Sequence, residues 1–164
     1  MEIFTTTDVS KTGVKLDRFK EWLRGGYVVP SVKKATGRGT KHLFSRFDLY
    51  MIKLFDHLMS LGLQREEAAA LIGLLNTSQK TGPRNMEAVT DSHFILFILW
   101  DDHVKEMNPG DQPAPIRLVR PEKNDALKIE FEPVDAKLAV DHCLGAYMVP
   151  FKALKDGVDA ALAK

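Results

Sequence analysis

The 164-residue sequence has little cysteine and no long apolar run, and each absence excludes a class of protein. Its one cysteine, Cys143, cannot form an intrachain disulfide, which favours a reducing compartment. The longest apolar run, Phe94–Trp100, is far shorter than the roughly 20 residues that a membrane-spanning helix needs. The start, Met1-Glu2-Ile3, has neither the basic nor the apolar segment of a signal peptide. We therefore expect a soluble, cytoplasmic protein with no membrane contact.

The sequence also lacks the residue patterns that support catalysis or metal binding. Asp101-Asp102-His103 and His142-Cys143 have no further ligands at the spacing that zinc requires. The second pair also lacks the surrounding residues of an activated nucleophile. A Gly-rich phosphate-binding loop ending in Lys and Ser or Thr is missing as well. We expect no enzymatic activity, no metal and no cofactor.

Positive charge is present, and it is concentrated in one segment. Between Lys11 and Arg46 there are ten Lys or Arg and two acids, which gives +8 in a chain whose total is +1. Residues 1–77 hold 12 basic and 8 acidic groups, whereas residues 78–164 hold 11 and 14. An acidic second half would repel a polyanion, so any contact with nucleic acid is expected in the first half.

The first half has the pattern of short helices separated by turns. Thr5-Thr6-Thr7 can cap a first helix, and Thr12-Gly13-Val14 is typical of a turn in which glycine adopts a positive φ. Apolar residues then recur at helical spacing over 16–23. Residues 31–41 are basic and contain glycine, which predicts a hairpin. Two further helices follow, the first of them opened by the capping box Ser45-Arg46-Phe47-Asp48.

The second half has the pattern of a small α+β domain. Residues 78–91 are polar and contain Gly82-Pro83, which predicts a linker. The uniformly apolar 94–100 predicts a strand buried on both faces. Apolar and polar residues alternate in Ile116–Arg120 and in Leu127–Glu132, which predicts two half-exposed strands. An amphipathic helix is expected after Pro150. Aromatic residues here are expected in the core, with an effector pocket as the alternative; they are Phe97, Trp100 and Tyr147.

A series of motifs in the first half follows one order and spacing. They are Asp8-Val9-Ser10-Lys11, Thr12-Gly13-Val14, Phe19-Lys20-Glu21-Trp22-Leu23-Arg24, Gly26 with Pro30, Leu43-Phe44-Ser45, Asp48-Leu49, and Leu61-Gly62-Leu63 with Glu66-Glu67. In this order they resemble the first helix, turn, recognition helix, wing and following helix pair of the winged helix-turn-helix domain in MerR-type regulators. The resemblance covers about residues 4–72.

The resemblance implies a mainly α N-terminal winged helix-turn-helix domain at 1–77, followed after the linker by an α+β domain at 92–164. The second domain would mediate dimerisation or effector binding. The implied function is that of a nucleoid-associated transcriptional regulator that binds specific double-stranded DNA as a homodimer, with RNA polymerase as a further partner. The expected DNA contacts are Lys15, Arg18, Lys20, Trp22, Arg24, Lys33, Lys34, Arg38, Lys41 and His42.

Two acids depart from the family pattern, and they leave alternatives open. Asp17 stands where the family often has an arginine, and it would repel phosphate unless Arg18 neutralises it. Glu21 replaces the first aromatic residue of the recognition-helix signature, and Trp22 suits a phosphate contact and a core position equally well. The alternatives are a protein-interaction adaptor that retains the winged fold, and an architectural DNA-binding protein of the excisionase kind.

Overall fold

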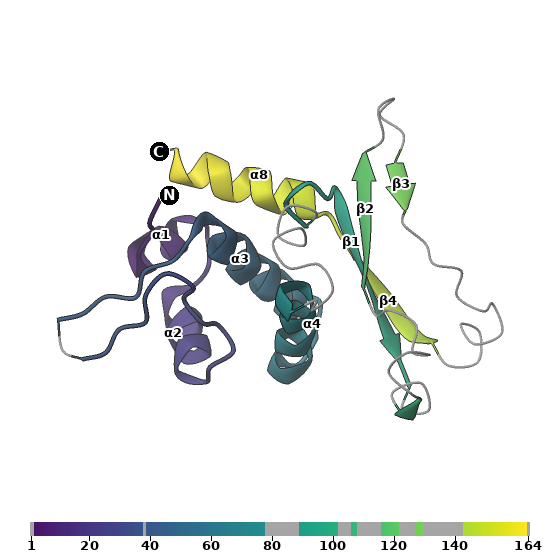
Figure 1. The fold of residues 1–164 in the computed structure, drawn as a ribbon, viewed down its shortest axis with the longest axis horizontal. Helices are drawn as coiled ribbons and strands as arrows, with labels where there is room; N and C mark the ends of the chain where they lie inside the picture. The colour runs from purple at the N-terminus through teal and green to yellow at the C-terminus, as the bar shows by residue number, and fades with distance from the viewer. Residues whose placement is uncertain are drawn as a thin grey trace. The chain divides into compact units, whose positions relative to one another are not determined.

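Helices and one antiparallel sheet make up the described part of the chain (Figure 1). The computed structural model describes residues 2–37, 39–77, 89–101, 106–107, 116–121, 127–129 and 143–163. The helices are α1 (Thr6–Lys11), α2 (Leu16–Arg24), α3 (Arg46–Ser60), α4 (Arg65–Thr77) and α8 (Phe151–Leu162). The strands are β1 (Phe94–Trp100), β2 (Ile116–Pro121), β3 (Leu127–Ile129) and β4 (Cys143–Val149). The expected mixture of α and β structure is confirmed.

The chain divides into two units, and most of α8 belongs to the first. One unit is Met1–Gly73 with Ala153–Lys164, and the other is Leu74–Lys152. The expected second domain at 92–164 includes α8, whose Asp159 is bonded to α3. Its Oδ1 accepts from Arg46 Nη1 at 2.6 Å and from the Tyr50 hydroxyl at 2.8 Å. Burial and then the bond to Asp159 raise the pKa of Tyr50 to about 12.

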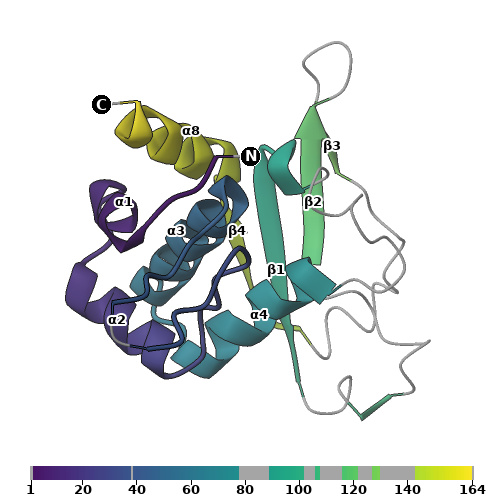
Figure 2. The same ribbon diagram turned by 60° about the vertical axis from the view of Figure 1, so that its left-hand side comes forward.

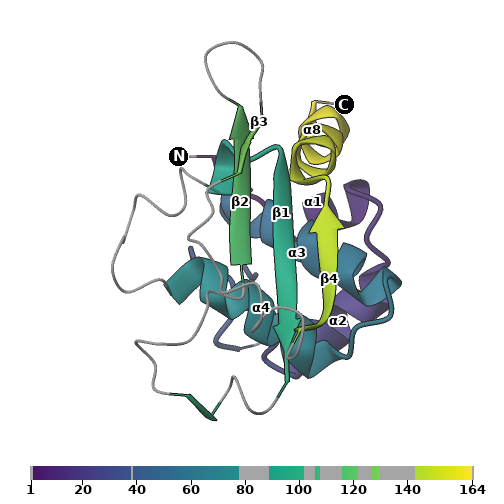
Figure 3. The same cartoon turned by 90° about the vertical axis from the view of Figure 1, so that its right-hand side faces the viewer.

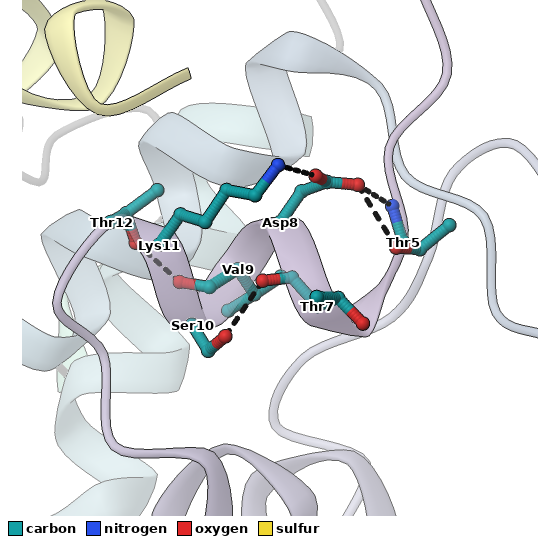
Figure 4. A network of polar contacts seen from close by, with 7 residues as sticks. All are labelled: Thr5, Thr7, Asp8, Val9, Ser10, Lys11 and Thr12. Atoms are coloured by element: carbon teal, nitrogen blue, oxygen red, sulfur yellow. Dashed lines mark hydrogen bonds and ion pairs between the residues drawn. The ribbon is translucent and has the colours of Figure 1, made fainter. Parts of the chain in front are cut away.

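Local hydrogen bonds around Asp8 fix the first helix (Figure 4). Thr5 is the N-cap of α1, and its N–H and Oγ1 both donate to Asp8 Oδ2 at 2.9 Å. Lys11 Nζ donates to Asp8 Oδ1 at 2.9 Å, and this bond is the main cause that lowers the pKa of Asp8. Gly13, in the turn to α2, has φ +84°, as predicted. The first turn therefore follows from short-range chemistry.

Helix α3 begins at its predicted capping box and is the most buried helix of the first unit. Ser45 N–H donates to Asp48 Oδ2 at 2.8 Å, and Asp48 N–H donates to Ser45 Oγ at 3.1 Å. Figures 1 and 2 show α1, α2 and α8 arranged around α3. The buried side chains of α3 are Leu49, Tyr50, Met51, Ile52, Leu54, Phe55 and Leu58.

The sheet of the second unit has the order β3-β2-β1-β4, with every pair antiparallel (Figure 3). Ile95 and Phe97 of β1 are fully buried, whereas Leu96 and Ile98 are half-buried. The prediction that both faces of this strand are buried is therefore wrong. An uninterrupted apolar run is typical of a doubly covered strand, but an antiparallel sheet can leave one face partly open.

Strand β4, which the sequence did not predict, extends this half-open face. Leu144 and Met148 are 70% and 62% exposed and alternate with residues that are more buried. On the other face, Tyr147 lies opposite the fully buried Phe97 in the β1–β4 register. This pairing agrees with the core position expected for Phe97; the side chain of Trp100 lies outside the described residues.

Candidate nucleic-acid interface

Two buried aromatic side chains set the orientation of α2. Phe19 and Trp22 are 0% and 1% exposed. The Trp22 ring meets Phe55 of α3 edge-on with centroids 4.8 Å apart, and Phe19 meets Phe44 at 5.7 Å. Because these contacts hold one side of α2 against the core, the opposite side faces solvent.

The burial of Trp22 resolves the two alternatives for this residue. With 1% of its surface exposed, the indole has no surface with which to reach a phosphate directly. Trp22 is therefore a core residue, and its place among the expected DNA contacts is corrected. Trp22 influences the surface only through Arg18, whose guanidinium lies over the Trp22 ring at 5.8 Å from the centroid.

The basic side chains predicted on α2 are exposed, as a DNA contact requires. Lys15 lies at the N-cap, and Arg18, Lys20 and Arg24 lie along the helix. Among the described residues none of the four forms an ion pair, so their charges are available to an outside partner. The cation–π contact of Arg18 leaves its charge intact while restricting where the guanidinium lies.

The expected basic hairpin is present and runs as far as Leu43. Lys33 and Leu43 exchange backbone hydrogen bonds of 3.1 and 2.9 Å. Near the tip, the N–H groups of Thr36 and Gly37 donate to Thr40 Oγ1 at 2.9 and 3.0 Å. Gly39 has φ +87°, which other residues rarely adopt.

The hairpin carries the second group of predicted contacts. Lys33, Lys34 and Lys41 are exposed and, like those of α2, form no ion pair among the described residues. His42 is half-buried, and its Nδ1 accepts from the backbone N–H of Ala35 at 3.3 Å. It therefore has an internal structural role in the hairpin. Arg38 lies outside the described residues.

Contacts at the base of the hairpin join it to α2 and α3 (Figure 1). Phe44, which is fully buried, meets Phe19 of α2, and its backbone pairs with that of Phe4. At the other end, Ser31 Oγ donates to Asp48 Oδ2 at 2.7 Å. The two groups of lysines and arginines therefore lie on elements that share one core.

Internal ion pairs reduce the set of available charges. Lys11 is paired with Asp8, and Arg46 with Glu2 and Asp159. Removing these two from the ten basic residues leaves eight, of which Arg38 is not described. We call the remaining seven the basic set: Lys15, Arg18, Lys20, Arg24, Lys33, Lys34 and Lys41.

The two acids of α2 differ in their surroundings. Arg65 Nη2 of α4 donates to Glu21 Oε2 at 3.3 Å, a pairing across 44 residues that no local sequence pattern predicts. Asp17 is exposed and has no hydrogen bond or ion pair with any other described side chain. The proposed neutralisation by Arg18 is not observed, since that guanidinium lies over Trp22.

The described residues contain no group of three or more His, Cys, Asp or Glu that could hold a metal ion. Of the segments 101–103 and 142–143, which lack further ligands at zinc spacing, the structure describes only Asp101 and Cys143. Every helix among the residues that the structure describes is too short or too polar to cross a bilayer.

Comparison with known proteins gives no family assignment: no family model matches the chain, and no curated protein matches it.

Proposed function

We propose that this protein is a DNA-binding transcriptional regulator whose first unit contacts duplex DNA through the basic set. The observation that carries the proposal is the availability of seven exposed cations on α2 and the adjoining hairpin. Duplex DNA binds such a set because each neutralised phosphate releases condensed counterions. The acids of the chain are largely elsewhere, as its second half is net negative.

The local structure supports a winged helix-turn-helix as the way this surface is presented. Helix α1, a turn at the positive-φ Gly13, and α2 follow one another directly. The hairpin closed by Lys33 and Leu43 comes next and corresponds to the wing. In this arrangement α2 enters the major groove, while the hairpin contacts the flanking sugar-phosphate backbone.

We assign the contact between two copies of the chain to β4. Within the described sheet this strand pairs only with β1, so its other edge is open to a partner. Its sequence, Cys143–Val149, has no charged residue, so two copies can face each other without repulsion. The exposed Leu144 and Met148 supply apolar surface for a two-fold contact. A dimer places two copies of α2 on successive half-sites.

The salt dependence of binding to duplex DNA tests this function. If about five members of the basic set contact phosphate in each protomer, the dimer has a slope of about −9 for log affinity against log salt. A double variant, Lys15→Ala with Lys33→Ala, should reduce the magnitude of the slope by about 3 to 4. A slope near zero for the unaltered protein rules out the proposal.

A matched control removes a positive charge that lies outside the basic set. Lys53 of α3 is paired with Asp56 at 3.6 Å and is partly buried, so Lys53→Ala should leave the slope unchanged. If Lys53→Ala lowered the slope by half as much as the double variant, binding would follow total charge, and α2 with its hairpin would have no special role.

A protein-interaction adaptor is the second candidate, and the unpaired Asp17 is the observation that favours it. An exposed acid in the first turn of α2 weakens attraction to phosphate. A gel shift with random duplex at low salt separates the candidates, because an adaptor would give no shift. An architectural protein would bind and bend the duplex without changing transcription from it.

A further inference from the structure

We infer that Asp17 reads a cytosine in the DNA half-site, so that the acid on α2 determines specificity. The assignment rests on the proposed function and goes beyond it, because it identifies one base and the side chain that selects it. Three observations support it: the position of Asp17 on α2, the absence of an internal partner among the described residues, and the chemistry of a carboxylate.

The position of Asp17 follows from the burial of its neighbours. Phe19 and Trp22 are buried and Leu23 is half-buried, and at 100° per residue Asp17 points about 165° away from the mean direction of these three. It is therefore the outermost side chain in the first turn of the helix. Recognition helices contact base edges mainly with residues near their N-termini.

Two cations flank this outermost position. By the same geometry Arg18 and Lys20 lie on opposite sides of α2, each about 100° from the core direction. When a helix lies in the major groove, its flanks face the two phosphate backbones and its outermost residues face the bases. Arg18 and Lys20 are thus suited to phosphate, while Asp17 is held away from it.

The other outward acid serves as an internal comparison. Glu21 lies one turn further along the same face, but it is paired with Arg65 of α4. Asp17 has no such partner among the described residues. Its carboxylate is left with its full capacity to accept hydrogen bonds from a ligand.

A carboxylate discriminates among bases because it can only accept hydrogen bonds. In the major groove cytosine offers the N4 amino donor, whereas guanine and thymine present acceptors at O6, N7 and O4. Adenine offers one donor beside the N7 acceptor, which repels the second carboxylate oxygen. Cytosine is therefore the base that Asp17 favours.

Selection of bound sequences from a random duplex library tests the assignment. The unaltered protein should select cytosine at one symmetric position in each half-site. Asp17→Asn should change that position to adenine, because an amide can bond to both N6 and N7, with a change in preference of about tenfold. Glu21→Gln is the matched control and should still select cytosine, since Glu21 is held by Arg65.

The possible results separate this assignment from the proposed function. If Asp17→Asn selects the same bases as the unaltered protein, the reading of cytosine by Asp17 is wrong, although DNA binding stands. If the unaltered protein shows no salt-dependent binding to any duplex, both proposals fail. Because Asp17 is exposed, Asp17→Asn should unfold at the same urea concentration as the unaltered protein, so a loss of binding cannot be attributed to misfolding.

Discussion

Replacing Trp22 tests whether its side chain belongs to the core of the first unit or to its surface. Trp22 is 1% exposed and packs edge-on against Phe55, so Trp22→Ala leaves a cavity that the two helices cannot close fully. Large aromatic truncations of this kind cost about 3–5 kcal/mol, and a domain's whole stability is about 5–15 kcal/mol. We therefore expect Trp22→Ala to lose a large share of the stability of the first unit.

Urea unfolding followed by far-UV circular dichroism measures this loss. With a urea dependence of about 1–3 kcal/mol per M, the midpoint of Trp22→Ala should fall by at least about 1 M. Trp22→Phe keeps an aromatic ring against Phe55, so its urea midpoint should fall by less. An unchanged midpoint for Trp22→Ala would refute the core assignment.

The same variants test whether Trp22 contacts DNA. Trp22→Phe removes the indole N–H but retains most of the packing, so the folded protein should keep its affinity for duplex DNA at a fixed salt concentration. A hydrogen bond from the indole to phosphate would instead make Trp22→Phe bind about tenfold or more weakly per protomer, while its stability stayed near that of the unaltered protein. That outcome would contradict the position of Trp22 in the structure.

Further predictions concern stability and assembly. Gly13→Ala should destabilise the protein by about 1–2 kcal/mol, because Gly13 has a φ of +84°. Gly157→Ala lies within α8, where an added Cβ meets no other atom, and should stabilise the protein by about 0.5–1 kcal/mol. The urea midpoint of each variant measures these changes. The pKa of Tyr50 is raised from 10.0 in the unfolded chain to about 12 in the folded protein. The stabilisation that this hydroxyl contributes is therefore complete below the unfolded pKa and is lost as pH rises through the folded pKa. Stability should therefore decline between about pH 10 and 12 more steeply in the unaltered protein than in Tyr50→Phe, and equal declines would show that Tyr50 does not contribute. Replacing Leu144 and Met148 together by Asp should give a monomer in sedimentation, and an unchanged mass would place the contact elsewhere.

Features set by short-range chemistry were predictable from the sequence. The capping box of Ser45 and Asp48 needs only residues three apart, and it forms as predicted. The positive φ of Gly13 follows from the absence of a Cβ. The hairpin and the exposed basic residues of α2 follow from local composition and helical spacing in the same way.

Features that depend on distant partners were not predictable. Strand β4 has apolar residues on both its buried and its exposed sides, and it contains Gly145, so no alternating pattern marks it. The burial of Trp22 required Phe55 from another helix. The same holds for Glu21, whose availability to DNA was decided by Arg65.

The return of α8 to the first unit has a consequence for how the protein folds during synthesis. Asp159 meets Tyr50 and Arg46 across 109 and 113 residues of chain, and the whole second unit lies between them in sequence. On the ribosome, α1 to α4 therefore emerge long before the helix that completes their packing, and closing so large a loop is entropically slow. Until α8 is synthesised, Tyr50 of the nascent first unit therefore lacks its hydrogen bond to Asp159.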